Sequence, residues 1–177
     1  PTACIKFCSP LAVAINTYYG LICLFMFNGY KGRYQVRNYK KYIGDPSKVV
    51  FRSLWERKVM VYFDTRKEIH RWSSEEIAIP YRNPYDGKLH RYFPDFYCER
   101  LDPTTGKIIK EVIEVKPKIQ TQPPKSKGKK FLIERKTYII NQTKWEAAND
   151  WCIDKGYEFR IFTEDQIRPA GRKTKRK

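Results

Sequence analysis

The segment Ile108 to Lys116 reads IIKEVIEVK, and it constrains the fold more than any other part of the chain. A β-branched run of this length predicts a β-strand. Two turn signals precede it: the pair Asp86-Gly87, which is typical of hairpins, and the segment Asp102 to Gly106. They divide the preceding sequence into strands over residues 77–81 and 89–98. The sequence therefore predicts three consecutive strands that form an antiparallel meander.

A helix is expected just before this meander. Ser53 and Glu56 have the spacing of a capping box, which predicts a helix from about Leu54 to Lys67. Two roles are open to Glu56: its side chain can complete the cap with Ser53, or its carboxylate can point from the helix start toward a site on the sheet. The spacing alone favours neither role.

The C-terminal half of the chain predicts a second helix and a final strand. The helix covers residues 131–157, and an interruption near Asn141 is allowed because Thr143 to Glu146 offers a second capping box. Gly156 supplies the helix stop, and residues 158–162 have the composition of a short strand. The fold class is thus mixed α/β (α+β), with a central sheet and helices beside it.

The charge of the chain indicates a polyanionic partner. Of its 177 residues, 36 are Lys or Arg and 19 are Asp or Glu, which gives a formal net charge of +17. Nucleic acid is the first candidate partner and an anionic membrane surface the second. The five cysteines form no CxxC pair, which argues against a zinc site or a disulfide framework and fits a reducing cytosol.

Four segments differ in composition. Residues 1–25 are almost uncharged, and we expect them to be a non-native or disordered leader, with the native chain starting near Met26. Residues 26–50 are expected to form a basic extended arm, residues 51–167 the folded domain, and residues 168–177 a basic, disordered tail. Within the domain, residues 116–130 contain six lysines and no acid, which predicts a loop that faces solvent or DNA. The expected DNA-binding residues are Arg33, Lys40, Lys41, Lys118, Lys125, Lys127, Lys129 and Lys130.

Three side chains are candidates for catalysis. Glu114 and Lys116 share one face of their strand, because alternate residues of a strand point to the same side. Asp95 follows Pro94 on the preceding strand, and antiparallel pairing brings it near Glu114. Asp95, Glu114 and the carbonyl of Val115 can hold Mg²⁺ or Mn²⁺, and Lys116 can orient a nucleophile or stabilise charge on phosphorus. The alternative is that these residues form an ordinary polar strand face.

Several segments resemble the head completion nucleases of contractile-tailed bacteriophages. They include YIGDPSKVVFRSLWERK from Tyr42, GKLHRYFPDFY from Gly87, EVIEVKPKIQTQPP from Glu111, KWEAANDWC from Lys144 and YEFRIFTED from Tyr157. The resemblance covers about residues 26–167 and does not reach residues 1–25. The PDF, EVKP and TED segments are also similar to the TnsA-type nucleases that cut transposon ends.

The resemblance implies a restriction-endonuclease-like PD-(D/E)xK core of αβββαβ order. It implies that Asp95, Glu114 and Lys116 are catalytic, that Glu56 is the acid of the helix, and that the activity is cleavage of packaged DNA during head completion and head-tail joining. Double-stranded DNA is then the substrate, portal or neck proteins are further partners, and the host cytoplasm during phage assembly is the expected location, with the virion as a second one. The alternatives are a non-cleaving protein that binds a DNA end or the portal, and a transposon end nuclease.

Overall fold

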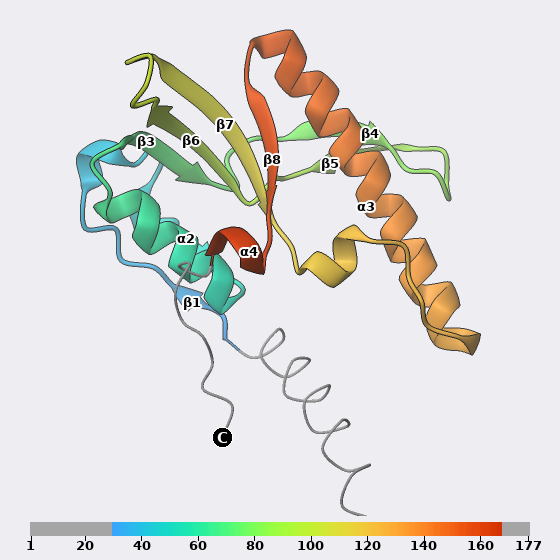
Figure 1. Ribbon diagram of the computed structural model, residues 1–177. Helices are drawn as coiled ribbons and strands as arrows, with labels where there is room; N and C mark the ends of the chain where they lie inside the picture. Colours follow the sequence, from blue (N-terminus) through green and yellow to red (C-terminus); the bar gives the residue numbers. More distant parts are fainter. Residues whose placement is uncertain (1–29, 168–177) are drawn as a thin grey trace, which may run out of the picture.

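A four-stranded mixed sheet lies at the centre of the computed structural model, which describes residues 30–167 (Figure 1). The strand order is β3-β6-β7-β8; the first three strands are antiparallel, and β7 and β8 are parallel. The strands are β3 (Ile69–Ser74), β6 (Phe96–Leu101), β7 (Ile108–Val115) and β8 (Glu158–Phe162). The parallel pair is connected through a long helix, as a parallel crossover requires.

Helices cover both faces of this sheet. Helix α2 (Leu54–Thr65) packs Phe63 against Trp72 and Phe96 on one face. Helix α3 (Gly128–Lys155) packs Trp145 and Ala148 on the other face, beside β8. The core order is therefore α2-β3-β6-β7-α3-β8, which confirms the predicted mixed α/β class and the αβββαβ order.

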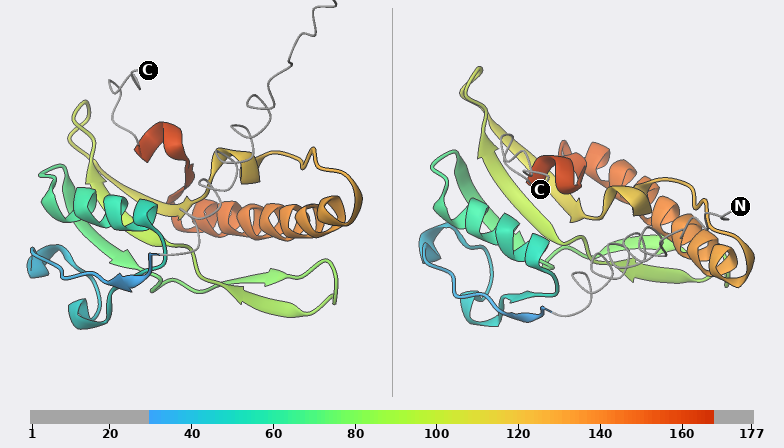
Figure 2. Two further views of the ribbon diagram at one scale, coloured as in Figure 1. Left: turned by 90° about the horizontal axis from the view of Figure 1, so that it is seen from below. Right: turned by 60° about the horizontal axis from the view of Figure 1, so that its bottom comes forward.

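A two-stranded hairpin is inserted between β3 and β6, so residues 77–81 and 89–98 contain strands as predicted, but the predicted meander of these segments with β7 was wrong. Strands β4 (Ile79–Arg82) and β5 (Leu89–Tyr92) pair only with each other and lie as a layer against α3 (Figure 2). The expected strand 89–98 is divided at Pro94, which has no N–H to donate to a sheet ladder. The meander starts with β3 instead. Its IHRWSS sequence does not alternate apolar and polar residues, and its pairing with β6 shifts register between Ile69 and Arg71.

The segment predicted to be an extended arm folds onto the domain. It contains β1 (Gly32–Arg33), η2 (Tyr39–Lys41), η3 (Pro46–Lys48) and β2 (Val50–Phe51), and Tyr34, Val36, Tyr42 and Val49 are buried in the core. The buried carboxylate of Asp64 accepts hydrogen bonds from the Tyr34 hydroxyl at 3.0 Å, the Arg37 N–H at 2.7 Å and the Asn38 N–H at 2.9 Å. Tyr34 and Tyr42 therefore pack in the protein, while Tyr30 and Tyr39 remain exposed together with the cations of this segment.

Helix α3 runs without the interruption that was allowed near Asn141. The Thr143 hydroxyl donates to the Ile139 carbonyl at 3.1 Å within the helix, so Thr143 caps no new helix. Gly156 ends α3 with a φ of 68°, as predicted. The remaining short elements are η4 (Lys118–Thr121) and α4 (Glu164–Ile167). The leader 1–25, residues 26–29 of the predicted arm and the whole tail 168–177 lie outside the described residues.

Across residues 30–167, every helix is either too short or too polar to cross a membrane.

Candidate active site

The pairing of β6 with β7 sets the position of Asp95. Phe96 pairs with Ile113, so Asp95, one residue before β6, lies opposite Glu114. The N–H of Val115 donates to Oδ2 of Asp95 at 2.7 Å, which fixes this carboxylate at the end of the sheet. The structure thus places Asp95 and Glu114 on neighbouring strands.

Glu114 has two further partners. Its side chain is buried, its Oε1 lies 2.9 Å from Nζ of Lys116, and its Oε2 accepts a hydrogen bond of 2.7 Å from the Tyr92 hydroxyl. The N–H of Lys116 donates to the Phe162 carbonyl at 2.9 Å, so β8 holds the lysine backbone in place. We refer to Asp95, Glu114 and Lys116 as the sheet-end cluster.

The electrostatics of the sheet-end cluster depend on its burial. Burial and the charge of Glu114 raise the pKa of Asp95 well above its usual value, although Lys116 and the Val115 N–H act against this shift. Burial alone would lower the pKa of Lys116, but the charges of Glu114 and Asp95 outweigh it and raise that pKa. Two adjacent carboxylates therefore compete for one ammonium group, an arrangement that a further cation or a proton stabilises.

Glu56 both caps α2 and acts on this cluster. Its N–H donates to Oγ of Ser53 at 3.1 Å, while its carboxylate accepts from the Ser53 hydroxyl at 2.8 Å and from the Arg52 N–H at 2.6 Å. The negative charge of Glu56 also contributes to the raised pKa values of Asp95 and Lys116. The two roles left open by the sequence are thus compatible in one side chain.

Tyr92 and Lys144 were not among the predicted site residues. Tyr92 lies on β5, and its hydroxyl contacts Glu114 across 22 positions of sequence. Lys144 lies on α3, near enough for the charges of Glu114 and Lys116 to act on its ammonium group. No local motif indicates either contact, because both depend on how the hairpin and α3 pack beside β7.

Comparison with known proteins agrees with this geometry. A family model described as the TnsA-like endonuclease N-terminal domain matches residues 66–164. The head completion nuclease of Enterobacteria phage T4 is 38% identical over 149 residues, which cover 80% of this chain and 96% of that protein. The chain belongs to this TnsA-like nuclease family. The family resemblance and the restriction-endonuclease-like fold inferred from the sequence are thereby confirmed. The TnsA-like match contains the whole sheet-end cluster and begins after Glu56.

The other acids of the TnsA-like domain do not extend this cluster into a complete ligand set. Within residues 30–167, no three His, Cys, Asp or Glu side chains are grouped so that they could hold a metal ion. A divalent ion bound beside Asp95 and Glu114 would therefore need other oxygen ligands, such as a main-chain carbonyl, water or substrate. Mg²⁺ commonly keeps several such ligands, so the two carboxylates and the Val115 carbonyl fit it.

The predicted DNA-binding residues fall into three groups. Lys125, Lys127 and Lys129 are exposed on the loop before α3 and at its start, and within the described residues they form no ion pair. Lys118 pairs with Asp165 at 2.7 Å and Lys130 with Glu134 at 3.7 Å. The arm residues are Arg33, Lys40 and Lys41.

The arm residues do not share one location. Arg33 pairs with Val50 in the small sheet that directly precedes α2, so it lies toward the helix end that carries Glu56. Nζ of Lys41 donates to the carbonyl of Arg66, the C-cap of α2, at 2.6 Å. Because α2 has 12 residues and rises about 1.5 Å per residue, Lys40 and Lys41 lie about 18 Å from the Glu56 end.

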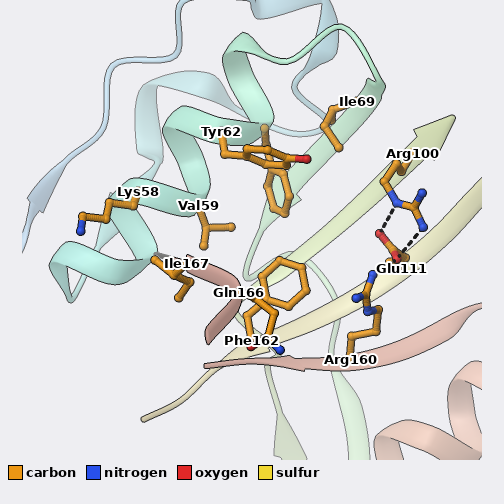
Figure 3. Close-up of a pocket in the computed structure, with 11 residues that line it drawn as sticks. Lys58, Val59, Tyr62, Ile69, Arg100, Glu111, Arg160, Phe162, Gln166 and Ile167 are labelled. Carbon is orange, nitrogen blue, oxygen red and sulfur yellow. Dashed lines mark hydrogen bonds and ion pairs between the residues drawn. The ribbon is translucent and has the colours of Figure 1, made fainter. Parts of the chain in front are cut away.

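A separate pocket of about 450 Å³ lies on the α2 face of the sheet (Figure 3). Glu111 and Glu114 are three positions apart on β7, so Glu111 points to the opposite face from Glu114. Figure 3 shows the Glu111 carboxylate between Arg100 and Arg160, whose nitrogens lie 3.2 and 2.7 Å from it. Burial would raise the pKa of Glu111, but the hydrogen bonds from both arginines outweigh it and lower that pKa. This paired acid holds three strands together and is not part of the sheet-end cluster.

Proposed function

We propose that this protein is a metal-dependent DNA nuclease that cuts packaged DNA during phage head completion and head-tail joining. The observation that carries the proposal is the convergence of Asp95, Glu114 and Lys116 at the end of β7. The similarity to a head completion nuclease over 96% of that protein supports the biological setting. We further propose double-stranded DNA as the substrate, portal or neck proteins as partners, and the host cytoplasm during assembly as the location.

Each residue of the sheet-end cluster has a chemical role in this proposal. Asp95, Glu114 and the Val115 carbonyl would hold Mg²⁺ or Mn²⁺, which when bound polarises a phosphoryl oxygen and lowers the pKa of bound water. Lys116 places its ammonium beside Glu114, where it can orient the nucleophile and stabilise negative charge on the phosphorane-like transition state. Tyr92 keeps the Glu114 carboxylate in one orientation by its hydrogen bond to Oε2. Glu56 adds a third negative charge at the edge of the site.

Two other functions remain as competing hypotheses. A transposon end nuclease is favoured by the TnsA-like match over residues 66–164, but the phage relative aligns with a larger part of the chain. A non-cleaving protein that binds a DNA end or the portal would use the exposed lysines alone. Such a protein has no need for two buried carboxylates beside a lysine, and the cost of burying them favours a catalytic role.

The proposal is tested by incubating the full chain with linear and supercoiled double-stranded DNA. We expect cleavage with Mg²⁺ or Mn²⁺, none in chelator, and a loss of at least about 100-fold in Asp95→Asn and Lys116→Met, because each variant removes a charge that the transition state needs. DNA binding in chelator should persist in both variants. Failure of the wild-type protein to cut with either ion, while it still binds DNA, would support the non-cleaving alternative.

A further inference from the structure

Lys144 reaches the sheet-end cluster from the side opposite α2. It lies on α3, and its Nζ is 5.5 Å from the centre of the Tyr81 ring and 5.7 Å from the centre of the Tyr92 ring. Tyr92 is therefore shared: its ring faces Lys144, while its hydroxyl donates to Glu114 at 2.7 Å. One rigid side chain thus sets the position of the Lys144 ammonium relative to the Glu114 carboxylate.

Among the described residues, no carboxylate pairs with the ammonium of Lys144. Within residues 30–167 no acid forms an ion pair with it, whereas Lys116 has Glu114 at 2.9 Å. The side chain is half-buried, and burial is the main cause of its lowered pKa, with Glu114 and Lys116 as the two charges that act on it. A half-buried cation without a counter-ion is costly, and two tyrosine faces compensate for this only in part.

We propose that Lys144 binds the scissile phosphodiester of the DNA substrate. This inference rests on the proposed nuclease function. Asp95 and Glu114 repel a phosphate, and Lys116 is paired with Glu114. Within residues 30–167, Lys144 is therefore a cation beside the cluster that has no carboxylate partner and is free to contact a phosphate oxygen. A bound phosphodiester in turn supplies the anion that Lys144 lacks. The substrate is then held between Lys116 at the end of β7 and Lys144 on α3.

Lys136 offers a matched control on the same helix. Its Nζ lies 5.0 Å from the centre of the Tyr85 ring, in the turn between β4 and β5, so it makes the same kind of cation–π contact at the far end of the hairpin. The experiment compares Lys144→Met, Lys144→Arg and Lys136→Met in the full chain. Three quantities are measured: affinity for a short duplex in chelator, the single-turnover cleavage rate with saturating DNA and Mg²⁺, and the unfolding temperature.

We expect Lys144→Met to weaken binding about 3–10-fold and to lower the saturated cleavage rate about 10–100-fold, as loss of a charged contact to phosphate implies. Lys144→Arg should keep the rate within about threefold of wild type, because it keeps the charge. Lys136→Met should match wild type in rate. The unfolding temperature of Lys144→Met should not fall, since the substitution removes an unpaired, half-buried charge.

Each other outcome is decisive. A Lys144→Met variant that cleaves at the wild-type rate overturns the contact with the scissile phosphate, and weaker binding alone would assign Lys144 to a neighbouring phosphate instead. Equal defects in the Arg and Met variants, or a rate loss that parallels a lower unfolding temperature, would overturn a role for the charge. If the wild-type protein itself is inert with Mg²⁺ and Mn²⁺, the proposed function fails first and this inference fails with it.

Discussion

Asp95 and Glu111 show how the surroundings of a carboxylate decide its use. Both belong to the pair β6–β7 or its edge, yet the pKa of Asp95 is raised by burial and Glu114, while the pKa of Glu111 is lowered because Arg100 and Arg160 outweigh its burial. The folded protein therefore disfavours the charged form of Asp95, which is typical of a carboxylate in a functional site. It favours the charged form of Glu111, so this carboxylate stabilises the fold.

Asp95→Asn and Glu111→Gln should therefore change stability in opposite directions at pH 7. We expect Asp95→Asn to raise the unfolding temperature by about 2–4 °C, because it removes a buried charge and its amide oxygen can still accept from the Val115 N–H. Glu111→Gln should lower that temperature by about 4–8 °C, a loss of about 2 kcal/mol that allows for the partial exposure of both arginines. Thermal unfolding in chelator measures both.

The effect of each substitution on stability should depend on pH. Asp95 has a raised folded-state pKa, so its destabilising effect is absent below the unfolded-state value near 3.8 and grows as the pH rises toward the folded-state value. Glu111 has a lowered folded-state pKa, so its stabilising effect is complete above about 4.5 and is lost as the pH falls below that. Both differences from wild type should shrink toward pH 3. If the two variants still differ from wild type in unfolding temperature at pH 3, and by unequal amounts, the differences come from packing and not from charge.

At the scale of elements, the start of α2 combines a cap with an acid of the site. Ser53 and Glu56 exchange hydrogen bonds as a capping box, and the Glu56 carboxylate also accepts from the Arg52 N–H. Helix α2 is packed against the same sheet whose end carries Asp95. The capping geometry therefore fixes both the helix start and the direction in which Glu56 presents its charge.

Ser53→Ala and Glu56→Gln should separate these two functions. Ser53→Ala should cost about 1 kcal/mol of stability, because it removes the acceptor of the Glu56 N–H, and leave kcat/KM within about threefold. Glu56→Gln should lower kcat/KM about 10–100-fold at a similar or smaller cost in stability, because it removes the charge that acts on Asp95 and Lys116. Thermal unfolding and steady-state cleavage are measured on both. Wild-type activity in Glu56→Gln would reduce its role to capping.

Local signals predicted the elements that local interactions determine. The capping box located α2, Gly156 located the end of α3, and residues 158–162 were confirmed as β8. Strand β3 was missed because its irregular pairing removes the alternation that marks a strand. The arm was misread because its buried tyrosines look like surface aromatics until Asp64, nearly 30 residues away, is known to bind the segment.

The same distinction holds in the candidate site. Asp95, Glu114 and Lys116 could be predicted to converge because strand alternation and one turn determine their relation. Tyr92 and Lys144 could not, since their contacts depend on an inserted hairpin and on the packing of α3 against it. Sequence spacing thus identifies the residues that one pair of strands brings together. Residues that the hairpin and α3 bring to the site, such as Tyr92 and Lys144, are found only from the structure.

At the scale of the whole molecule, charge is spread over both ends of the sheet. The net charge of +17 attracts DNA at long range, but only cations along the path of a duplex bound at the sheet-end cluster can contact its phosphates. A first set, Lys125, Lys127, Lys129 and Lys130, is exposed on the segment that connects Lys116 to α3 and at the start of that helix. The opposite end of the sheet carries Lys67, Lys107, Lys110 and Lys155, which are also exposed. These two sets have equal charge and different positions.

Replacing each set of four lysines by glutamine should distinguish contact from overall attraction. Binding is measured in chelator at several salt concentrations. In the variant that replaces Lys125, Lys127, Lys129 and Lys130, the slope of log Kd against log salt concentration should fall by about 2–4, because each lost phosphate contact removes about 0.9 from that slope. The variant at the opposite end should change the slope by less than about 1, although it loses the same charge. Fluorescence anisotropy with a short duplex at several salt concentrations measures both slopes. Equal changes in the two variants would mean that DNA is bound by net charge and that the loop holds no defined path for it.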